Sequence, residues 1–272
     1  MDAGARGHPV GLAKGTLVTV HFVGAGPGAA DLITLRAASL LSAADVVLYP
    51  GTYIDEQVLS HCRERADLVD TQELDLDRIT AVMVEADAAG RDVVRLTSGD
   101  PSLYSALHEQ TRRLDAAGVT WDVTPGVPAY AAAAAIVGRE LTVPLVAQSV
   151  VLTRTQARST AMPDRESLAA FAGTGATLVL HLAITRTREL MDELAPHYGD
   201  DCPVAVVSRA SQAEELVLHG TVATIAGLVE EAGLRQAAVI LVGAALAPDH
   251  QRSDAESYLY SPERIARKER LR

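Results

Sequence analysis

The sequence predicts an α/β protein of two domains, with a doubly wound, mainly parallel sheet in the first and a mixed sheet in the second. Apolar runs typical of buried strands alternate with helical patterns, and short turns join them. This alternation breaks at Arg139–Leu145, which marks the expected domain boundary. Beyond the break, two strand patterns follow one another without a helix between them, which favours a mixed sheet.

The first half of the chain alternates strand and helix throughout. Its first strand covers 17–24 and leads into a glycine-rich turn, after which we expect Asp31 to cap a helix that ends near Ala44. The same patterns predict strands at 46–49, 92–97 and 120–124, and helices at 76–86, 103–114 and from 129 to Gly138. Successive strand–helix units with short joints imply parallel strands.

The second half carries the patterns of a smaller sheet. Strands are predicted at 148–153, 177–182, 204–208, 215–219 and 238–242, and helices at 166–172, 185–194 and 221–231. We therefore divide the chain into a flexible arm (1–16), a first domain (17–143), a second domain (144–250) and a charged tail (251–272).

Composition excludes several classes of protein. Acidic residues outnumber basic ones by 35 to 24, a net charge of −11, which is the wrong sign for a nucleic-acid partner. No apolar run is long enough to span a membrane. Two cysteines, Cys62 and Cys202, make neither a disulfide scaffold nor a multi-cysteine centre, and the histidines lack metal-ligand spacing. We expect a cytoplasmic protein without a protein-bound metal.

Three turns rich in glycine and proline follow predicted strands. The turn at Val23–Ala29 fits the dinucleotide fingerprint formally, but Tyr49 and Pro50 stand where the ribose-binding acid is expected, and Pro27 has no N–H for a phosphate. Two further turns, Ser98–Pro101 and Pro125–Pro128, come at the carboxyl ends of other strands. Ligands of open α/β sheets bind at that edge, so the three turns predict a backbone-lined site.

These motifs resemble a known family. The segments VGAGPGAADLIT (23–34), SGDPSLY (98–104) and TPGVPAYAAAAA (124–135) resemble the tetrapyrrole methyltransferase superfamily. The segments 147–158 and 197–211 are similar to its members that methylate C-11 of precorrin-4 in cobalamin synthesis. The resemblance implies two α/β domains with a cleft between them, a homodimer, a tetrapyrrole substrate converted to precorrin-5, and S-adenosyl-L-methionine as cofactor, released as S-adenosyl-L-homocysteine.

The resemblance also assigns site residues by motif. The cofactor-binding residues would be Pro27, Ser98, Gly99, Asp100, Leu103, Pro128, Ala129, Leu182, Ala210 and Ala238. Pro128 stands where many relatives carry a hydroxyl side chain, which removes one polar contact. Asp100 and Tyr104 are the candidates for a direct part in catalysis, although Asp100 would equally suit an Asx turn before Pro101.

A polycarboxylate substrate requires a local basic patch in so acidic a protein. Arg154 and Arg158, just after the first predicted strand of the second domain, are the best candidates for binding it. Three alternatives remain open: a methyltransferase acting at another ring position, one acting on a cobalt-containing substrate, and a regulator that binds a dinucleotide at the first glycine turn.

Overall fold

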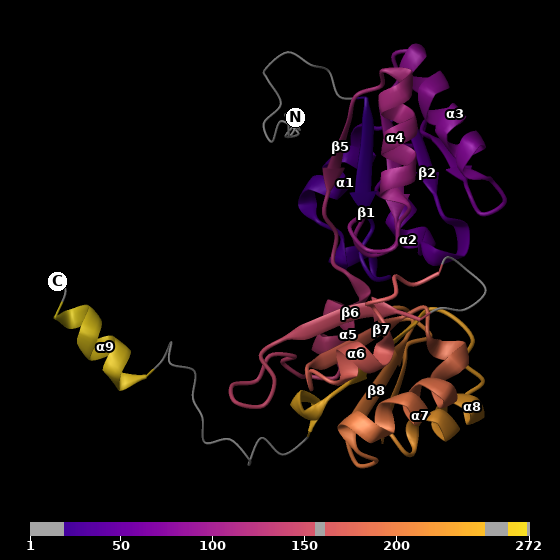
Figure 1. The fold of residues 1–272 in the computed structure, drawn as a ribbon. Coiled ribbons are helices and arrows are strands. Elements are labelled where there is room, and N and C mark those ends of the chain that lie inside the picture. The colour runs from indigo at the N-terminus through magenta and orange to yellow at the C-terminus, as the bar shows by residue number, and fades with distance from the viewer. Residues whose placement is uncertain (1–18, 156–160, 248–260, 271–272) are drawn as a thin grey trace, which may run out of the picture. The chain divides into compact units, whose positions relative to one another are not determined.

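The computed structural model describes residues 19–155, 161–247 and 261–270, and it shows the α/β class that the sequence predicts (Figure 1). The chain divides into two compact units, Met1–Pro128 and Ala129–Arg272. The predicted arm at 1–16 lies outside the described residues. None of the described helices is both long enough and apolar enough to cross a membrane.

The first unit is built on a five-stranded sheet in which every pairing is parallel. Its strands, in the spatial order β3-β2-β4-β1-β5, are β1 (Val20–Gly24), β2 (Val46–Tyr49), β3 (Asp67–Asp70), β4 (Val93–Thr97) and β5 (Trp121–Thr124). All but one residue in each of β1 and β2, and every residue of β4, are buried, as expected for a parallel sheet covered on both faces.

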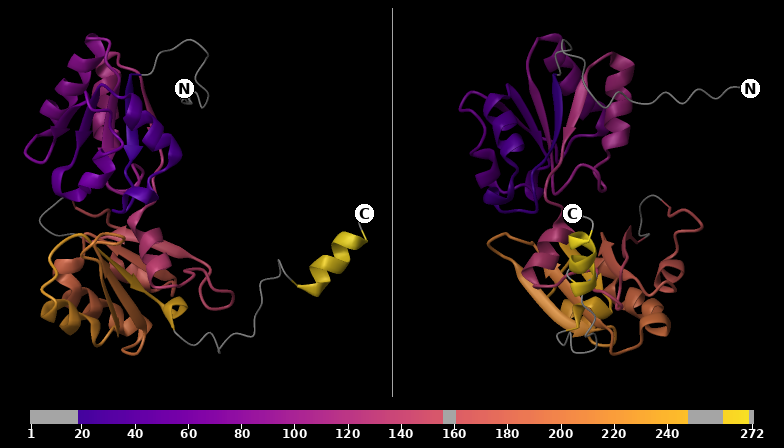
Figure 2. Two further views of the ribbon diagram at one scale, coloured as in Figure 1. Left: turned by 180° about the vertical axis from the view of Figure 1, so that it is seen from behind. Right: turned by 90° about the vertical axis from the view of Figure 1, so that its left-hand side faces the viewer.

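Helices cover both faces of this sheet (Figure 2). On one face α1 (Leu35–Ala43) and α2 (Glu56–Leu59) pack against a core that includes Val23 and Leu96. On the other, α3 (Leu76–Ala88) and α4 (Leu107–Ala117) pack against Phe22 and Val93. Single helical turns, η1 (Ala30–Leu32) and η2 (Gly51–Tyr53), follow β1 and β2. The sheet is therefore doubly wound, as predicted.

Two local predictions for this unit were wrong, and the strand β3 was missed. Asp31 lies in η1 and caps no helix; the cap of α1 is Thr34, whose hydroxyl accepts the Ala37 N–H at 3.1 Å. Helix α4 begins four residues after Leu103, because the loop before it turns through left-handed residues. The short polar edge strand β3 was not predicted, since DLVD lacks an apolar run.

The second unit contains the mixed sheet that the sequence predicts. Its strands, in the order β6-β7-β10-β8-β9, are β6 (Val150–Arg154), β7 (Thr177–His181), β8 (Pro203–Ser208), β9 (Leu216–Thr221) and β10 (Ala238–Val242). Only the pair β6–β7 is parallel; β10 runs antiparallel to both β7 and β8, and β9 to β8.

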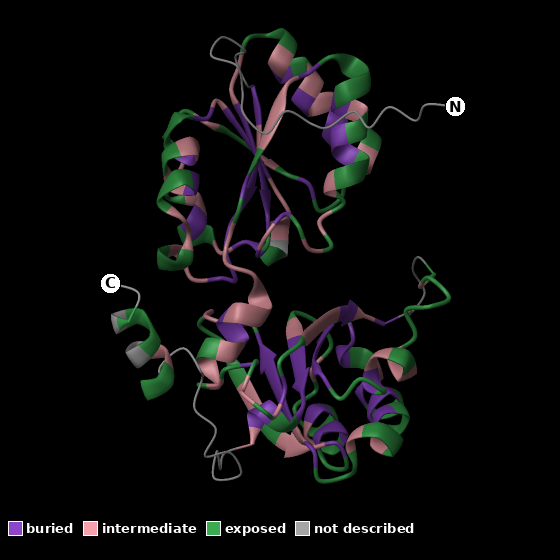
Figure 3. Cartoon of the chain, turned by 60° about the vertical axis from the view of Figure 1, so that its left-hand side comes forward, coloured by how far each residue is buried: buried purple, intermediate pink, exposed green. Residues whose placement is uncertain are grey.

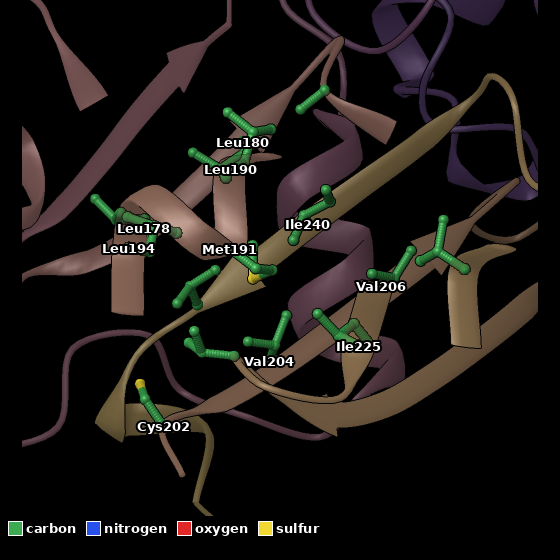
Figure 4. Close-up of a cluster of buried hydrophobic side chains, with 14 of the residues drawn as sticks. Leu178, Leu180, Leu190, Met191, Leu194, Cys202, Val204, Val206, Ile225 and Ile240 are labelled. Carbon is green, nitrogen blue, oxygen red and sulfur yellow. The ribbon is translucent and has the colours of Figure 1, made fainter. Parts of the chain in front are cut away.

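One face of this sheet carries α6 (Leu168–Ala172), α7 (Thr187–Tyr198) and α8 (Ile225–Glu231). Their apolar side chains interlock with Leu178, Leu180 and Ile240 of the strands (Figure 4). Short helical turns η3 (Ile184–Arg186) and η4 (Ala244–Leu246) and the terminal helix α9 (Pro262–Glu269), which lies in the predicted charged tail, complete the unit. Buried residues concentrate in the strands of each sheet, while the outer helix faces are exposed (Figure 3).

Helix α5 (Ala129–Ile136) explains where the units divide. Its residues Ala132 and Ala133 belong to the same buried cluster as Val179, Val207 and Leu241 of the second sheet. The helix therefore belongs to the second unit, and the division falls after Pro128 rather than at the predicted 143/144.

Candidate functional site

The three glycine turns leave the first sheet side by side. Strand β1 lies between β4 and β5 and pairs in parallel with both, so that Gly24 stands opposite Thr97, and Val23 opposite Thr124. All three strands therefore end at the same edge, and the turns that follow them start from adjacent positions. We refer to the turns 25–28, 98–103 and 125–128 as the glycine edge.

Backbone contacts close these turns tightly against one another. The Gly26 N–H donates to the Gly99 carbonyl at 3.2 Å, and the Gly99 N–H donates back at 2.7 Å. A Cβ on Gly24 would lie 2.5 Å from the Gly126 nitrogen, and one on Gly126 would lie 2.8 Å from the Gly24 carbonyl carbon and overlap the Gly99 oxygen. Only glycine allows this approach.

Asp100 holds the glycine edge together through its side chain. One carboxylate oxygen accepts the Gly126 N–H at 2.9 Å, and the other accepts the Ser102 N–H at 2.8 Å and the Ser102 hydroxyl. Burial opposes ionisation, but these hydrogen bonds outweigh it and lower the pKa of Asp100. The Asx turn considered for Asp100 is thus present, and its carboxylate is charged at neutral pH.

The remaining predicted residues of the first unit surround this loop. Ser98 is exposed, Pro27 and Gly99 are buried, and Pro128 is half-buried. The half-buried Leu103 donates its N–H to the Asp100 carbonyl at 3.2 Å. Tyr104 is 46% exposed and has a left-handed φ of 53°. The structure therefore brings the predicted residues of this unit to one edge.

Residues predicted in the second unit also meet at one sheet edge. Arg154 ends β6 opposite His181, the last residue of β7, and Leu182 follows it. Because β10 is antiparallel to β7 and β8, its first residue Ala238 lies at that same edge, opposite Ser208, with Ala210 just beyond. Ala129 stands at the start of α5 and packs against the buried cluster that includes Ala210. Arg158 lies outside the described residues.

This second edge contains an unusual group of strained residues, which sequence reasoning missed. Leu182, Arg209, Ser211 and Ala237 all have left-handed φ angles, between 49° and 63°. The Arg209 N–H donates to the Ala237 carbonyl at 2.7 Å, which fixes two of them against each other. We refer to these four residues as the strained edge. Left-handed side-chain-bearing residues are costly and concentrate at functional sites.

His181, which stands opposite Arg154 in the strand register, carries no positive charge that would repel it. Burial lowers the pKa of His181, so the imidazole at this position opposite Arg154 is neutral near pH 7. Among the described residues, no group of three or more His, Cys, Asp or Glu side chains is arranged to hold a metal ion.

The surroundings of the first glycine turn differ from those of a dinucleotide site. The turn leads into η1, and α1 begins only at Leu35, so no helix N-terminus directly follows the glycines. Strand β2 ends at Tyr49, followed by Pro50 and Gly51. The acidic residue expected after that strand is absent from this described segment.

Comparison with known proteins identifies the family. Residues 19–226 match the family described as Tetrapyrrole (Corrin/Porphyrin) Methylases. The chain belongs to this family. This tetrapyrrole methylase is 53% identical to a precorrin-4 C(11)-methyltransferase from Rhodococcus erythropolis, over 91% of this chain and 98% of that protein.

Two solved structures show the same fold for this tetrapyrrole methylase. The X-ray structure of a cobalamin biosynthetic enzyme, cobalt precorrin-4 methyltransferase, is 36% identical and has a TM-score of 0.82, over 84% of this chain and 96% of that one. A uroporphyrin-III C-methyl transferase from Thermus thermophilus, complexed with S-adenyl homocysteine, is 29% identical with a TM-score of 0.69, over 84% and 98%.

Proposed function

We propose that the chain transfers a methyl group from S-adenosyl-L-methionine to C-11 of precorrin-4, giving precorrin-5, in cobalamin biosynthesis. The observation that carries the proposal is the glycine edge, where three turns converge around the charged Asp100. The 53% identity to a precorrin-4 C(11)-methyltransferase, over nearly its full length, supports the substrate and the position of methylation.

The chemistry of the glycine edge fits this cofactor. Glycine backbones allow a ligand to approach closely, and Ser98 offers an exposed hydroxyl. Asp100 carries a negative charge, and none of the ion pairs among the described residues includes it. S-adenosylmethionine has a net positive charge, which this carboxylate would stabilise. We propose that Pro27, Ser98, Gly99, Leu103 and Pro128 contact it.

The chain's own residues would act mainly by binding and orientation. S-adenosylmethionine supplies an electrophilic methyl group on a positively charged sulfur. Aligning that methyl group with the accepting carbon accounts for a large part of the rate enhancement in such a transfer. Asp100 would orient the turns through Gly126 and Ser102, and Tyr104 would lie beside the reacting groups.

Residues of the second unit complete the proposal. We propose Ala129, Leu182, Ala210 and Ala238 as further cofactor contacts, and Arg154 as a ligand for a substrate carboxylate. Arg154 is half-buried at its strand end, and its planar guanidinium is suited to bidentate binding of carboxylates. Because burial lowers the pKa of His181, this residue opposite Arg154 adds no second positive charge at the strand end.

A cobalt-containing precorrin is the second candidate substrate. It is favoured by the likeness to the cobalt precorrin-4 methyltransferase structure, at 36% identity. We place precorrin-4 first because the identity to the enzyme named for it is 53%. Methylation at another ring position is the remaining alternative.

One assay distinguishes these substrates. The chain is incubated with methyl-labelled S-adenosylmethionine and either precorrin-4 or cobalt-precorrin-4, and NMR locates the labelled carbon. We expect label at C-11 of precorrin-4, with slower transfer to the cobalt form. Label at another carbon, or faster transfer to cobalt-precorrin-4, would replace the proposed reaction with the corresponding alternative.

The role of Arg154 is tested by Arg154→Ala. Loss of a hydrogen bond to a charged group should raise the substrate KM about 10- to 150-fold, with unchanged affinity for S-adenosylhomocysteine. Arg188→Ala is the matched control, because Arg188 forms an exposed pair with Glu230 between α7 and α8. An unchanged KM in a stable Arg154→Ala protein would exclude the carboxylate role.

We also propose that the chain acts as a homodimer in the cytoplasm. The cysteines Cys62 and Cys202 are both free, which suits a reducing compartment. A monomeric mass by light scattering at micromolar concentration would contradict the dimer.

A further inference from the structure

Arg95 is a buried cation in the middle of the first sheet. It lies on β4, the central strand of five, and is only 7% exposed. Burial lowers the pKa of Arg95 to about 10, which still leaves the guanidinium charged at neutral pH. A buried charge is costly unless hydrogen bonds stabilise it.

The hydrogen-bond partners of Arg95 are all neutral. Its Nε donates to Gln110 Oε1 at 3.1 Å, and its Nη1 donates at 3.2 Å to both the Thr71 hydroxyl and the Leu96 carbonyl. No carboxylate pairs with it among the described residues. The charge of Arg95 therefore orients the dipoles of these neutral groups, chiefly the side-chain amide of Gln110.

Gln110 connects Arg95 to the loop that follows Asp100. Because its oxygen accepts from Arg95, its amide nitrogen must point the other way, where it donates to the Ala106 carbonyl at 3.1 Å and the Ser105 carbonyl at 3.3 Å. Gln110 is 1% exposed, so no solvent competes for these bonds. The Ser105 hydroxyl in turn donates to the Pro101 carbonyl.

The segment held in this way is strained. Tyr104 and Ala106 have left-handed φ angles of 53° and 55°, and α4 starts without a side-chain cap. A left-handed φ is unfavourable for a residue that carries a side chain, so the turn needs external anchors. Of the two carbonyls that Gln110 binds, one belongs to Ala106, a member of this left-handed pair, and the other to Ser105, which lies between the two members.

We propose that Arg95 and Gln110 are positioning residues that fix the 101–106 turn, and through it the cofactor loop at Asp100. Arg95 sets the orientation of the Gln110 amide, and Gln110 holds the turn in its left-handed conformation. The effect on cofactor affinity rests on the proposed function, whereas the effect on the turn does not.

Gln110→Glu tests this with little change in shape. A glutamate keeps the contact with Arg95 and gains an ion pair, but it cannot donate to the Ser105 and Ala106 carbonyls. We expect an unchanged or higher melting temperature, hydrogen exchange about tenfold faster in the 101–107 peptide, and S-adenosylhomocysteine affinity about tenfold weaker, as for the loss of one to two hydrogen bonds. Gln57→Glu, at an exposed position on α2, is the matched control and should change none of these.

The outcomes separate the two proposals. Faster exchange in 101–107 without any binding of S-adenosylhomocysteine by the wild-type chain would support the positioning role and refute the cofactor. Unchanged exchange in a folded Gln110→Glu protein, or faster exchange spread over β4 and α4 with a fall in melting temperature, would overturn the positioning role.

A second variant, Arg95→Lys, tests the proposal if the Gln110→Glu protein does not fold. Arg95→Lys keeps a charge but lacks the planar fork that reaches Thr71 and Gln110 together. We expect faster exchange confined to the same peptide, and equal exchange in the Arg95→Lys and wild-type proteins would overturn the proposal.

Discussion

The edges of the two sheets make left-handed turns with different residues. On the glycine edge of the first unit, glycines occupy the left-handed positions: Gly26 has φ 82° and Gly99 has φ 69°, and the left-handed Tyr104 and Ala106 follow this edge in the chain. In the second unit, left-handed φ angles belong to residues that carry side chains, namely Leu182, Arg209, Ser211 and Ala237. The difference determines what each edge presents. The glycine edge brings backbone against backbone, whereas the strained edge keeps side chains, including that of the 66% exposed Leu182.

This contrast suggests different roles for the edges. A surface of bare backbone, with one fixed charge at Asp100, suits a ligand that must approach closely. An edge that retains side chains at a conformational cost suits contacts that depend on their shape and charge.

Gly126→Ala should have the largest effect. Its Cβ would overlap the Gly99 carbonyl, so the turns must separate, which destabilises the first unit by about 2–3 kcal/mol and abolishes binding of S-adenosylhomocysteine. Gly227→Ala is the control, because nothing lies within 4 Å of its Cβ and it is inside helix α8. That change should stabilise by about 0.5–1 kcal/mol. Chemical denaturation measures the unfolding free energy of both variants. Equal effects would show that the turns do not approach closely at Gly126.

Asp100→Asn should have the next largest effect. The carboxylate accepts N–H donors on both oxygens, whereas an amide has only one acceptor and must turn its NH2 group toward the other donor. We expect a loss of about 1–2 kcal/mol in unfolding free energy, together with weaker binding of S-adenosylhomocysteine. A fully stable variant would show that Asp100 does not hold the turns together.

The wild-type and Asp100→Asn proteins should also differ in how their stability depends on pH. The pKa of Asp100 is lowered in the folded state, so its stabilisation is fully present above the ordinary value of about 3.9. It is lost as pH falls through the lowered folded value. The difference in melting temperature between wild type and Asp100→Asn should therefore be constant from pH 8 to about pH 5 and shrink below about pH 4. A difference that grows on acidification would contradict the assignment.

Ala237→Gly should have the smallest effect, of opposite sign. Ala237 is exposed and left-handed, so glycine removes strain of about 1–2 kcal/mol at the expense of about 0.4–1 kcal/mol of chain entropy. We expect a net stabilisation of about 0.5–1 kcal/mol. Ala116→Gly, exposed in helix α4, should instead destabilise by about the same amount. Destabilisation by both changes would mean that the second edge is not strained.

The contrast also explains how much of the structure could be predicted from the sequence. Glycine and proline mark the turns after β1, β4 and β5 directly, and the predicted strands at 46–49 and 238–242 match β2 and β10 residue for residue. Leucine, arginine and alanine leave no such signal when they adopt a left-handed φ, so the strained edge was not predicted. The parallel and mixed sheets were both predicted correctly.

Long-range packing accounts for the other differences. The boundary was placed too late because α5 packs on the second sheet through Ala132 and Ala133, a contact between distant parts of the chain. The Arg95–Gln110 pair was missed because a single arginine in an apolar strand does not reveal its partner 15 residues away. Such features depend on tertiary contacts, which a local pattern does not contain.

The crystal structure of the chain with S-adenosylhomocysteine tests the central claim most directly. We predict that the ligand lies against the glycine edge, in contact with Pro27, the Ser98–Leu103 turn and Pro128. Parallel titrations should show no binding of NAD at micromolar concentration. A fully occupied ligand elsewhere on the chain, or micromolar binding of NAD at the glycine edge, would contradict the claim that these three turns form the cofactor site.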